Sequence, residues 1–117
     1  MSDLRTAVHE LNDLILQGRA LDAFEKYYGD DVVMQDGDQE PWVGKETNRE
    51  REKDFFSKIT EFRGAEVKSV AVGDDVTMVE WNFDYTHADS GDVNYDQIAV
   101  QRWRDGKIVH ERFYRAG

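Results

Sequence analysis

The chain contains no cysteine, only one proline and no long apolar segment. The lack of cysteine excludes disulfide bonds, thiol catalysis and cysteine-ligated metals. A transmembrane helix needs about 20 consecutive apolar residues, whereas the N-terminal segment MSDLRTAVHELNDL carries charges throughout and is not typical of a signal peptide. We therefore expect a cytoplasmic protein without linkers or repeats.

Clusters of basic residues are also missing. The 15 lysines and arginines are scattered among 25 aspartates and glutamates, which gives a net charge of −10. Nucleic acids and anionic membranes would repel such a chain, so we expect neither as a partner. What remains is a globular composition, with 39% hydrophobic and 12% aromatic residues. The length of 117 residues suits one domain over residues 1–117.

The first half of the chain predicts three helices and one strand. Apolar residues recur at helical spacing over residues 4–15, where Ser2 can cap the helix and Gly18 can end it. Residues 20–28 predict a second short helix that Gly29 ends. A short strand, DVVMQD, and a turn at the proline then lead to a third helix over KETNREREKDFFSKI.

From about residue 63 the apolar period changes to two. Four strands are predicted, over residues 65–73, 76–87, 93–103 and 107–115. Turn residues separate them, and Asp105-Gly106 indicates a tight hairpin. Helices followed by an antiparallel meander predict an α+β fold, with the helices packed on one face of a curved sheet.

The order of these elements resembles a known family, and three segments carry the resemblance. They are LQGRALDAFEKYYGDDVVMQDG, VGKE at the start of the third helix, and QRWRDGKIVHERFY near the end. The chain resembles the NTF2-like superfamily, and within it the SnoaL-like (polyketide cyclase-like) and ketosteroid isomerase-like branch. The resemblance covers nearly the whole chain. It implies a cystatin-like cone, in which three N-terminal helices pack in the concave face of a strongly curved, mainly antiparallel sheet around a pocket.

The resemblance places Asp36 where ketosteroid isomerases keep their aspartate base. Their two hydrogen-bond donors for the oxyanion do not carry over. The tyrosine of the first helix falls near Leu11 or Asn12, and the protonated aspartate aligns with Ala99. Because removal of one such donor typically costs about 10²–10³ in rate, we do not expect steroid isomerisation.

Two of the predicted strands have distinct inward and outward faces. The strand over residues 76–87 places on its apolar face Val79, Trp81, Phe83 and Tyr85. The next strand has one face made of Tyr95, Gln97, Ala99, Gln101 and Trp103. The resemblance turns both faces toward the pocket. The apolar residues Ile98 and Val100 then lie on the convex side, which suggests a homodimer through that side of the sheet.

The last strand divides into a face with Val109, Glu111 and Phe113 and a face with His110, Arg112 and Tyr114. We assign the Glu111 face to the pocket, while the opposite assignment would make His110 an acid/base candidate.

The third helix is unusually polar where relatives have aliphatic residues, at Asn48 and Arg51. Either this helix is exposed, or it presents both residues to a polar cavity. A buried arginine must be paired, and Asp36 and Glu111 are the natural partners. A carboxylate–arginine–carboxylate set with an asparagine nearby resembles the epoxide-hydrolase branch, where such a set activates water.

Simpler interpretations stand beside these. Asp36 can be a turn-capping residue at the end of a strand, and the aromatic stripe can be core. A calcium loop in the segment DGDQE lacks both its glycine, replaced by Pro41, and its glutamate, replaced by Thr47, so we expect no metal. His9 and His87 have no ligand spacing and are interpreted as surface residues.

We therefore predict a small-molecule-binding protein, with Asp36, Arg51 and Glu111 as catalytic candidates. As an enzyme it would be a cofactor-free isomerase, cyclase or hydrolase with Asp36 as acid or base, because no nucleotide or flavin motif is present. The alternative is a non-catalytic ligand-binding or dimerisation module. The expected ligand is small and hydrophobic or amphipathic. The residues predicted to bind it are Met34, Trp42, Asn48, Phe56, Trp81, Phe83, Tyr95, Gln97, Trp103 and Phe113.

Overall fold

The computed structural model of the chain describes residues 3–116. Its helices are α1 (Leu4–Leu16), α2 (Ala20–Tyr27) and α3 (Lys45–Ser57). Its strands are β1 (Tyr28–Asp36), β2 (Trp42–Val43), β3 (Ile59–Val72), β4 (Val76–His87), β5 (Gly91–Arg104) and β6 (Lys107–Arg115). The three predicted helices and the predicted strands are thus present, with one additional short strand, β2.

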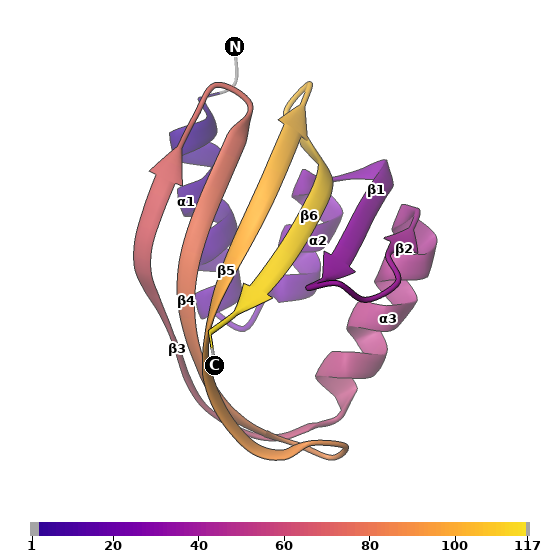
Figure 1. Cartoon of the computed structure of the whole chain (residues 1–117), viewed down its shortest axis with the longest axis vertical. Coiled ribbons are helices and arrows are strands. Elements are labelled where there is room, and N and C mark those ends of the chain that lie inside the picture. Colours follow the sequence, from indigo (N-terminus) through magenta and orange to yellow (C-terminus); the bar gives the residue numbers. More distant parts are fainter. Residues whose placement is uncertain (1–2, 117) are drawn as a thin grey trace.

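The strands form one sheet in the order β2-β1-β6-β5-β4-β3. Strands β3 to β6 are an antiparallel meander, and β1 joins them parallel to β6. In Figure 1 the helices α1 and α2 lie behind the sheet, and the lower ends of β3, β4 and β5 curve round toward α3. The predicted α+β cone with helices on the concave face is confirmed. None of the helices within residues 3–116 is long and apolar enough to cross a membrane.

Irregular strand pairing accompanies this curvature. The register between β3 and β4 shifts at three places along β3, the first between Ile59 and Glu61. An extra residue in one strand bends the sheet and increases its twist. Because residues 60–64 of β3 include glycine and charged side chains without alternation, the sequence pattern predicted a start at residue 65, which was too late.

A second irregularity changes which residues of β6 face inward. Trp103 pairs with Ile108 and Arg102 pairs with His110, so Val109 is the extra residue of a bulge. Ile108 is fully buried, whereas Val109 is only partly buried. The expectation that Val109 shares the inward face of Glu111 was therefore wrong, because the bulge gives that place to Ile108.

The boundaries of the first two helices differ slightly from the prediction. The Asp3 side chain caps α1 by accepting from the backbone N–H of Arg5 at 3.0 Å, while the predicted cap, Ser2, lies outside the described residues. Gly18 follows α1 with φ +78°, as predicted. Helix α2 ends at Tyr27, and Tyr28 is extended, with φ −95° and ψ 133°. Tyr28 therefore belongs to β1 and not to the helix.

The N-terminus of α3 depends on Gly44. Its φ of 96° and ψ of 149° belong to a region that only glycine adopts readily. Its N–H donates to the carbonyl of Val32 at 2.8 Å, next to the pairing of Val33 with Val43 between β1 and β2. This short pairing fixes where α3 begins relative to the sheet.

The core fills the end of the cone that α1 and α2 cover. One buried cluster joins α1 and α2 to β1, β5 and β6, and includes Leu11, Phe24, Val32, Met34 and Ile108. A second joins α1 to β3 and β4 through Val8, Val79 and Trp81. Each fully buried side chain of this size contributes about 1.5–3 kcal/mol. The end beneath α3 contains no such cluster among residues 3–116.

Candidate functional site

A cavity of about 830 Å³ lies inside the cone. All three helices and the inner faces of the strands line it, among them Leu11 of α1, Phe24 of α2 and Phe55 of α3. This volume is within the range of about 300–1,000 Å³ that is usual for small-molecule sites. Aromatic rings make up much of its wall, and they pack against one another. Trp81 stacks on Phe83 at 5.1 Å between ring centroids, and Phe83 lies 5.9 Å from Tyr95.

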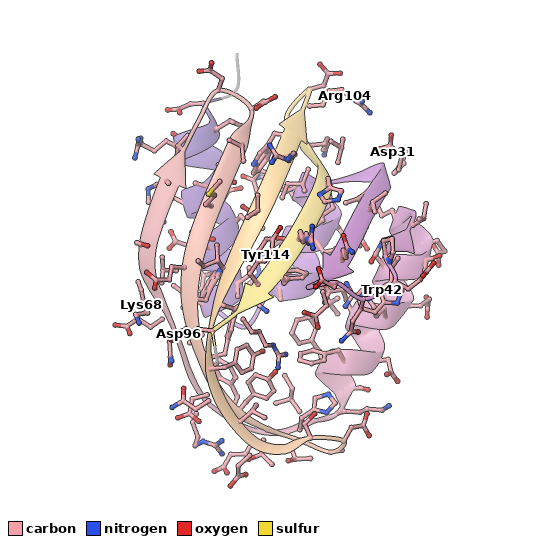
Figure 2. The ribbon with its side chains drawn as sticks, in the orientation of Figure 1. Asp31, Trp42, Lys68, Asp96, Arg104 and Tyr114 are labelled. Carbon is pink, nitrogen blue, oxygen red and sulfur yellow. The ribbon has the colours of Figure 1, made fainter. Side chains whose placement is uncertain are left out.

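Most of the residues predicted from the sequence line this cavity. The cavity wall includes all three predicted catalytic residues, which are Asp36, Arg51 and Glu111. From the ligand-binding set it includes Trp42, Phe56, Trp81, Phe83, Tyr95, Gln97 and Phe113. In Figure 2 Trp42 lies on β2, beside α3.

Three predicted ligand-binding residues do not line the cavity. Met34 and Trp103 belong to the packed core between the first two helices and the sheet. Asn48 is fully buried, with its amide bonded to the carbonyl oxygens of Trp42 and Gly44. All three side chains are buried, but away from the cavity.

Glu111 is the buried carboxyl group of the cavity wall, with 2% of its surface exposed. Its Oε1 accepts a hydrogen bond from the Tyr28 hydroxyl at 2.6 Å. Its Oε2 accepts from Nε2 of Gln101 at 2.8 Å. A carboxylate oxygen has two lone-pair sites, so each oxygen keeps one for a further partner on the cavity side.

A chain of hydrogen bonds fixes the orientation of Gln101. The indole N–H of Trp103 donates to Oγ1 of Thr77 at 2.9 Å, and this hydroxyl donates to Oε1 of Gln101 at 2.7 Å. The indole N–H can only donate, and the Thr77 hydroxyl donates its own proton to Gln101. The amide nitrogen of Gln101 is therefore the group that faces Glu111.

Burial raises the pKa of Glu111 to about 7. The hydrogen bonds from Tyr28 and Gln101 lower it, the charge of Glu52 raises it and the charge of Arg51 lowers it. The pKa of Tyr28 lies well above its usual value, mainly because of burial, so the tyrosine keeps its proton and donates. Near neutral pH, Glu111 is thus present in both protonation states, as a general acid or base requires.

Arg51 does not pair with Asp36 or Glu111, contrary to the expectation from the sequence. Within residues 3–116 it forms no ion pair with any carboxylate. Its guanidinium lies over the Trp42 ring, 4.1 Å from the centroid, and its Nη2 contacts the Met34 sulfur at 3.5 Å. A carboxylate–arginine–carboxylate set with direct contacts is therefore absent from this part of the chain.

Asp36 lies at the edge of the cavity, where β1 runs into an exposed turn. It pairs with Phe113 across the parallel strands and is only partly buried. The Glu111 carboxyl group on β6 is more deeply buried than that of Asp36.

Sequence reasoning missed several residues of the wall. Glu52 also lines the cavity, and its pKa is raised by burial and lowered by Arg51. The spacing of Asn48, Glu52 and Phe55 on one helical face was a signal that pointed to it. Tyr28 was missed because it was assigned to a helix.

His87 was interpreted as a surface residue and this was wrong, because only 6% of its surface is exposed. Its Nδ1 accepts from the backbone N–H of Asp89 at 3.1 Å. Its Nε2 therefore carries the proton, and it lies 3.2 Å from the carbonyl oxygen of Phe55. This contact joins the end of β4 to the end of α3 across the mouth of the cavity. His110 pairs with Arg102 and points away from the cavity.

Comparisons with known proteins agree with this architecture. A sequence profile of the SnoaL-like domain matches residues 8–111. A SnoaL-like protein from Mesorhizobium loti is 26% identical over 97% of this chain and 99% of its own, with a TM-score of 0.87. No curated protein matches the chain in sequence.

Two more distant structures share the fold. A cystatin-like protein from Xanthomonas campestris is 13% identical over 99% of this chain and 92% of its own, with a TM-score of 0.85. A protein with a ketosteroid isomerase-like fold from Catenulispora acidiphila, in complex with trimethylamine, is 13% identical over 86% of this chain and 78% of its own, with a TM-score of 0.70.

Proposed function

Because the chain belongs to the SnoaL-like domain family, we propose that it binds a small, mainly apolar organic molecule in the cavity and exchanges a proton with it through Glu111. The observation that carries this proposal is a buried carboxyl group, held by Tyr28 and Gln101, in the wall of an aromatic cavity. A carboxyl group is costly to bury, and a buried one is a recurrent feature of acid/base sites.

The chemistry that this arrangement supports needs no cofactor. In its carboxylate form Glu111 can remove a proton from a carbon atom of the ligand, and in its carboxylic acid form it can return a proton to another atom. Tyr28 and Gln101 hold the group in place, so little reorganisation is needed during transfer. Isomerisation consists of such transfers. In an aldol-type ring closure, proton removal gives an enolate whose carbon bonds to a carbonyl carbon, and the oxygen of the opened C=O double bond then takes the proton. Asp36, at the edge of the cavity, is proposed to contact the polar end of the ligand.

The exchange of carbon-bound hydrogen for deuterium provides a test that does not require the natural substrate. A panel of small aryl ketones and β-keto esters is incubated with the protein in D₂O, and exchange next to the carbonyl is followed by NMR. We expect catalysed exchange that falls by about 10²-fold or more in Glu111→Gln, as is usual for loss of a general acid or base. Exchange that survives this substitution would contradict the role of Glu111.

Asp36→Asn is the matched control, because Asp36 is the alternative carboxylate of the same cavity. A small effect of this substitution beside a large effect of Glu111→Gln supports the assignment. The reverse result would return the acid/base role to Asp36.

A non-catalytic binding module is the second candidate. It is favoured by the lack of both oxyanion donors. One corresponding position is Ala99, which lines the cavity, and the other is Leu11, which also lines it, or Asn12, which does not. This candidate predicts that ligands bind to both the original protein and Glu111→Gln, and that neither exchanges deuterium into them.

Apolar side chains on the convex side of the sheet support a homodimer as part of the proposal. Ile98 and Tyr114 pair across β5 and β6, and each has 42% of its surface exposed. Figure 2 shows Tyr114 on the side of the sheet away from α1 and α2. Sedimentation velocity should detect a dimer that Ile98→Lys converts to a monomer. If the original protein sediments as a monomer, the homodimer proposal is wrong.

A further inference from the structure

Arg51 differs from the other arginines of the chain in its surroundings. Five arginines form ion pairs with carboxylates, namely Arg19, Arg49, Arg63, Arg104 and Arg112. The other described arginines, Arg5, Arg51, Arg102 and Arg115, form none within residues 3–116, and of these four only Arg51 is partly buried. Arg51 and Arg115 both line the cavity. In a chain with 25 acidic residues against 15 basic ones, an unpaired arginine in a cavity needs an explanation, because a partly buried charge without a partner is costly.

The contacts of Arg51 hold it in one orientation. Asn48 donates through Nδ2 to the carbonyl oxygens of Trp42, at 3.1 Å, and Gly44, at 2.8 Å. Both protons of the amide are thus used, and its Oδ1 is left to face Arg51, at 3.3 Å from Nη2 and 3.4 Å from Nε. The Trp42 ring lies under the guanidinium. Stacking and an oriented amide are how proteins prepare an arginine for a planar anion.

The neighbouring carboxylates form no ion pair with Arg51 within residues 3–116. Glu111 is held by Tyr28 and Gln101 instead. Glu52 follows Arg51 directly along α3, and successive residues of a helix point in different directions. The protein has therefore placed acids near the arginine without closing an ion pair on it.

We infer that the ligand of this cavity carries one anionic group, of the carboxylate or enolate class, and that Arg51 binds it while the apolar body lies along Trp81 and Phe83. This inference rests on the proposed function and adds the chemical class of the ligand. A cationic ligand would meet the positive charges of Arg51 and Arg115, which lie over the Trp42 and Tyr95 rings. A dianion is disfavoured by the net charge of −10.

Three probes with the same apolar body test the inference: 4-phenylbutyrate, its neutral amide and 4-phenylbutylamine. Dissociation constants are measured by isothermal titration calorimetry at pH 8. We expect the carboxylate to bind about ten- to a hundredfold more tightly than the amide, in line with the strength of a charge-assisted hydrogen bond. In Arg51→Met this preference should disappear, so that the carboxylate and the amide bind with similar affinity.

Arg49→Met is the matched control, because Arg49 lies on the same helix and pairs with Glu25 outside the cavity. It should keep the preference for the carboxylate. Arg51→Lys keeps the charge without the planar fork and should keep only part of the preference. Near-ultraviolet circular dichroism of each variant checks that the aromatic cavity is intact, and Arg51→Lys carries the test if Arg51→Met does not fold.

The outcomes separate this inference from the proposed function. If the amide and the carboxylate bind equally, or if the amine binds most tightly, the cavity binds ligands but the anion inference is wrong. If the carboxylate preference persists in Arg51→Met, another group binds the anion and the inference is also wrong. If none of the three probes binds, the ligand-binding proposal fails together with the inference.

Discussion

Helices α1 and α3 have the same length of 13 residues and both lie against the sheet. They differ in what lies beneath them, which is packed core under α1 and a cavity under α3. Helix α1 turns an apolar face inward and buries Val8 and Leu11, so its end of the cone is filled. Helix α3 has no apolar residue before Phe55 and buries only Asn48. A cavity remains where a helix offers polar side chains to the inside of a sheet.

Each of the two helices also buries one asparagine, and the two differ in their partners. Asn48 on α3 donates twice to backbone carbonyls and accepts from Arg51. Asn12 on α1 is 3% exposed, and neither its amide oxygen nor its nitrogen has a partner among the described residues. A buried polar group without a partner is costly, so α1 is stabilised by apolar packing despite Asn12. In contrast, the hydrogen bonds of Asn48 stabilise α3.

The largest effect is expected from a truncation at the filled end. Ile108→Ala removes a fully buried side chain of the first cluster and should lower the free energy of unfolding by about 2–5 kcal/mol. Phe55→Ala removes a larger but partly exposed side chain from the cavity wall and should cost less, because no closed void is created. Urea unfolding of both variants checks this, and an equal or larger cost for Phe55→Ala would contradict the distinction between the two ends.

Glu111→Gln should change how stability depends on pH. The pKa of Glu111 is raised from 4.5 to about 7 in the folded protein, so its folded form binds a proton more readily than its unfolded form. Its contribution is complete below pH 4.5, is lost as the pH rises to about 7 and stays lost above it. The loss amounts to about 3 kcal/mol at most.

The glutamine variant lacks this loss and should gain in stability relative to the original protein between pH 5 and pH 8. Unfolding in urea at several pH values measures the difference between the two proteins. The pKa of Glu111 also depends on Tyr28, Glu52 and Arg51. Both proteins contain these three residues, so their own effect on the pH dependence largely cancels in the difference. A difference that does not vary with pH would mean that Glu111 is charged in water-like surroundings.

Asn48→Leu should destabilise the protein by about 1–3 kcal/mol, because the carbonyl oxygen of Trp42 and the guanidinium of Arg51 lose their partner. Thermal unfolding measures the effect. The same variant should weaken binding of 4-phenylbutyrate, since Arg51 is no longer oriented. Unchanged stability would show that the amide contacts of α3 contribute little.

Asn12→Leu should have the opposite sign and the smallest size, a gain of about 1 kcal/mol. The substitution keeps the number and branching of the side-chain heavy atoms and removes two unpartnered polar atoms, and leucine also favours the helix. Thermal unfolding beside Asn48→Leu gives a direct comparison of the two buried asparagines. A loss of stability would indicate that Asn12 has a partner, such as a buried water molecule.

Much of the fold could be predicted from the sequence because its signals are local. The spacing of apolar residues predicted α1 and the four strands of the meander, and Asp105-Gly106 predicted their last turn, where both residues have positive φ. The alternation along β4 predicted that Trp81 and Phe83 face inward, and both line the cavity. A regular backbone repeats its geometry every two or 3.6 residues, so such patterns identify faces.

The errors lie where a residue's role depends on a distant part of the chain. Tyr28 continues the pattern of α2, but its hydroxyl bonds to Glu111, 83 residues away. His87 is next to a turn and is nevertheless buried, because Phe55 of α3 lies over it at 4.8 Å. Val109 follows the alternation of β6, and only the bulge opposite Arg102 removes it from the inward face.

By itself, the sequence determined the elements, the order in which they occur and the side chains that each element turns inward. Only the tertiary structure decided which of those side chains meet. It is the docking of α3 against β1 and β2 that leaves Arg51 beside Trp42 without a carboxylate. It is the parallel pairing of β1 with β6 that buries Glu111 against Tyr28. Local patterns record the geometry of the backbone, whereas pKa values and ion pairs depend on groups that come together only when the sheet closes.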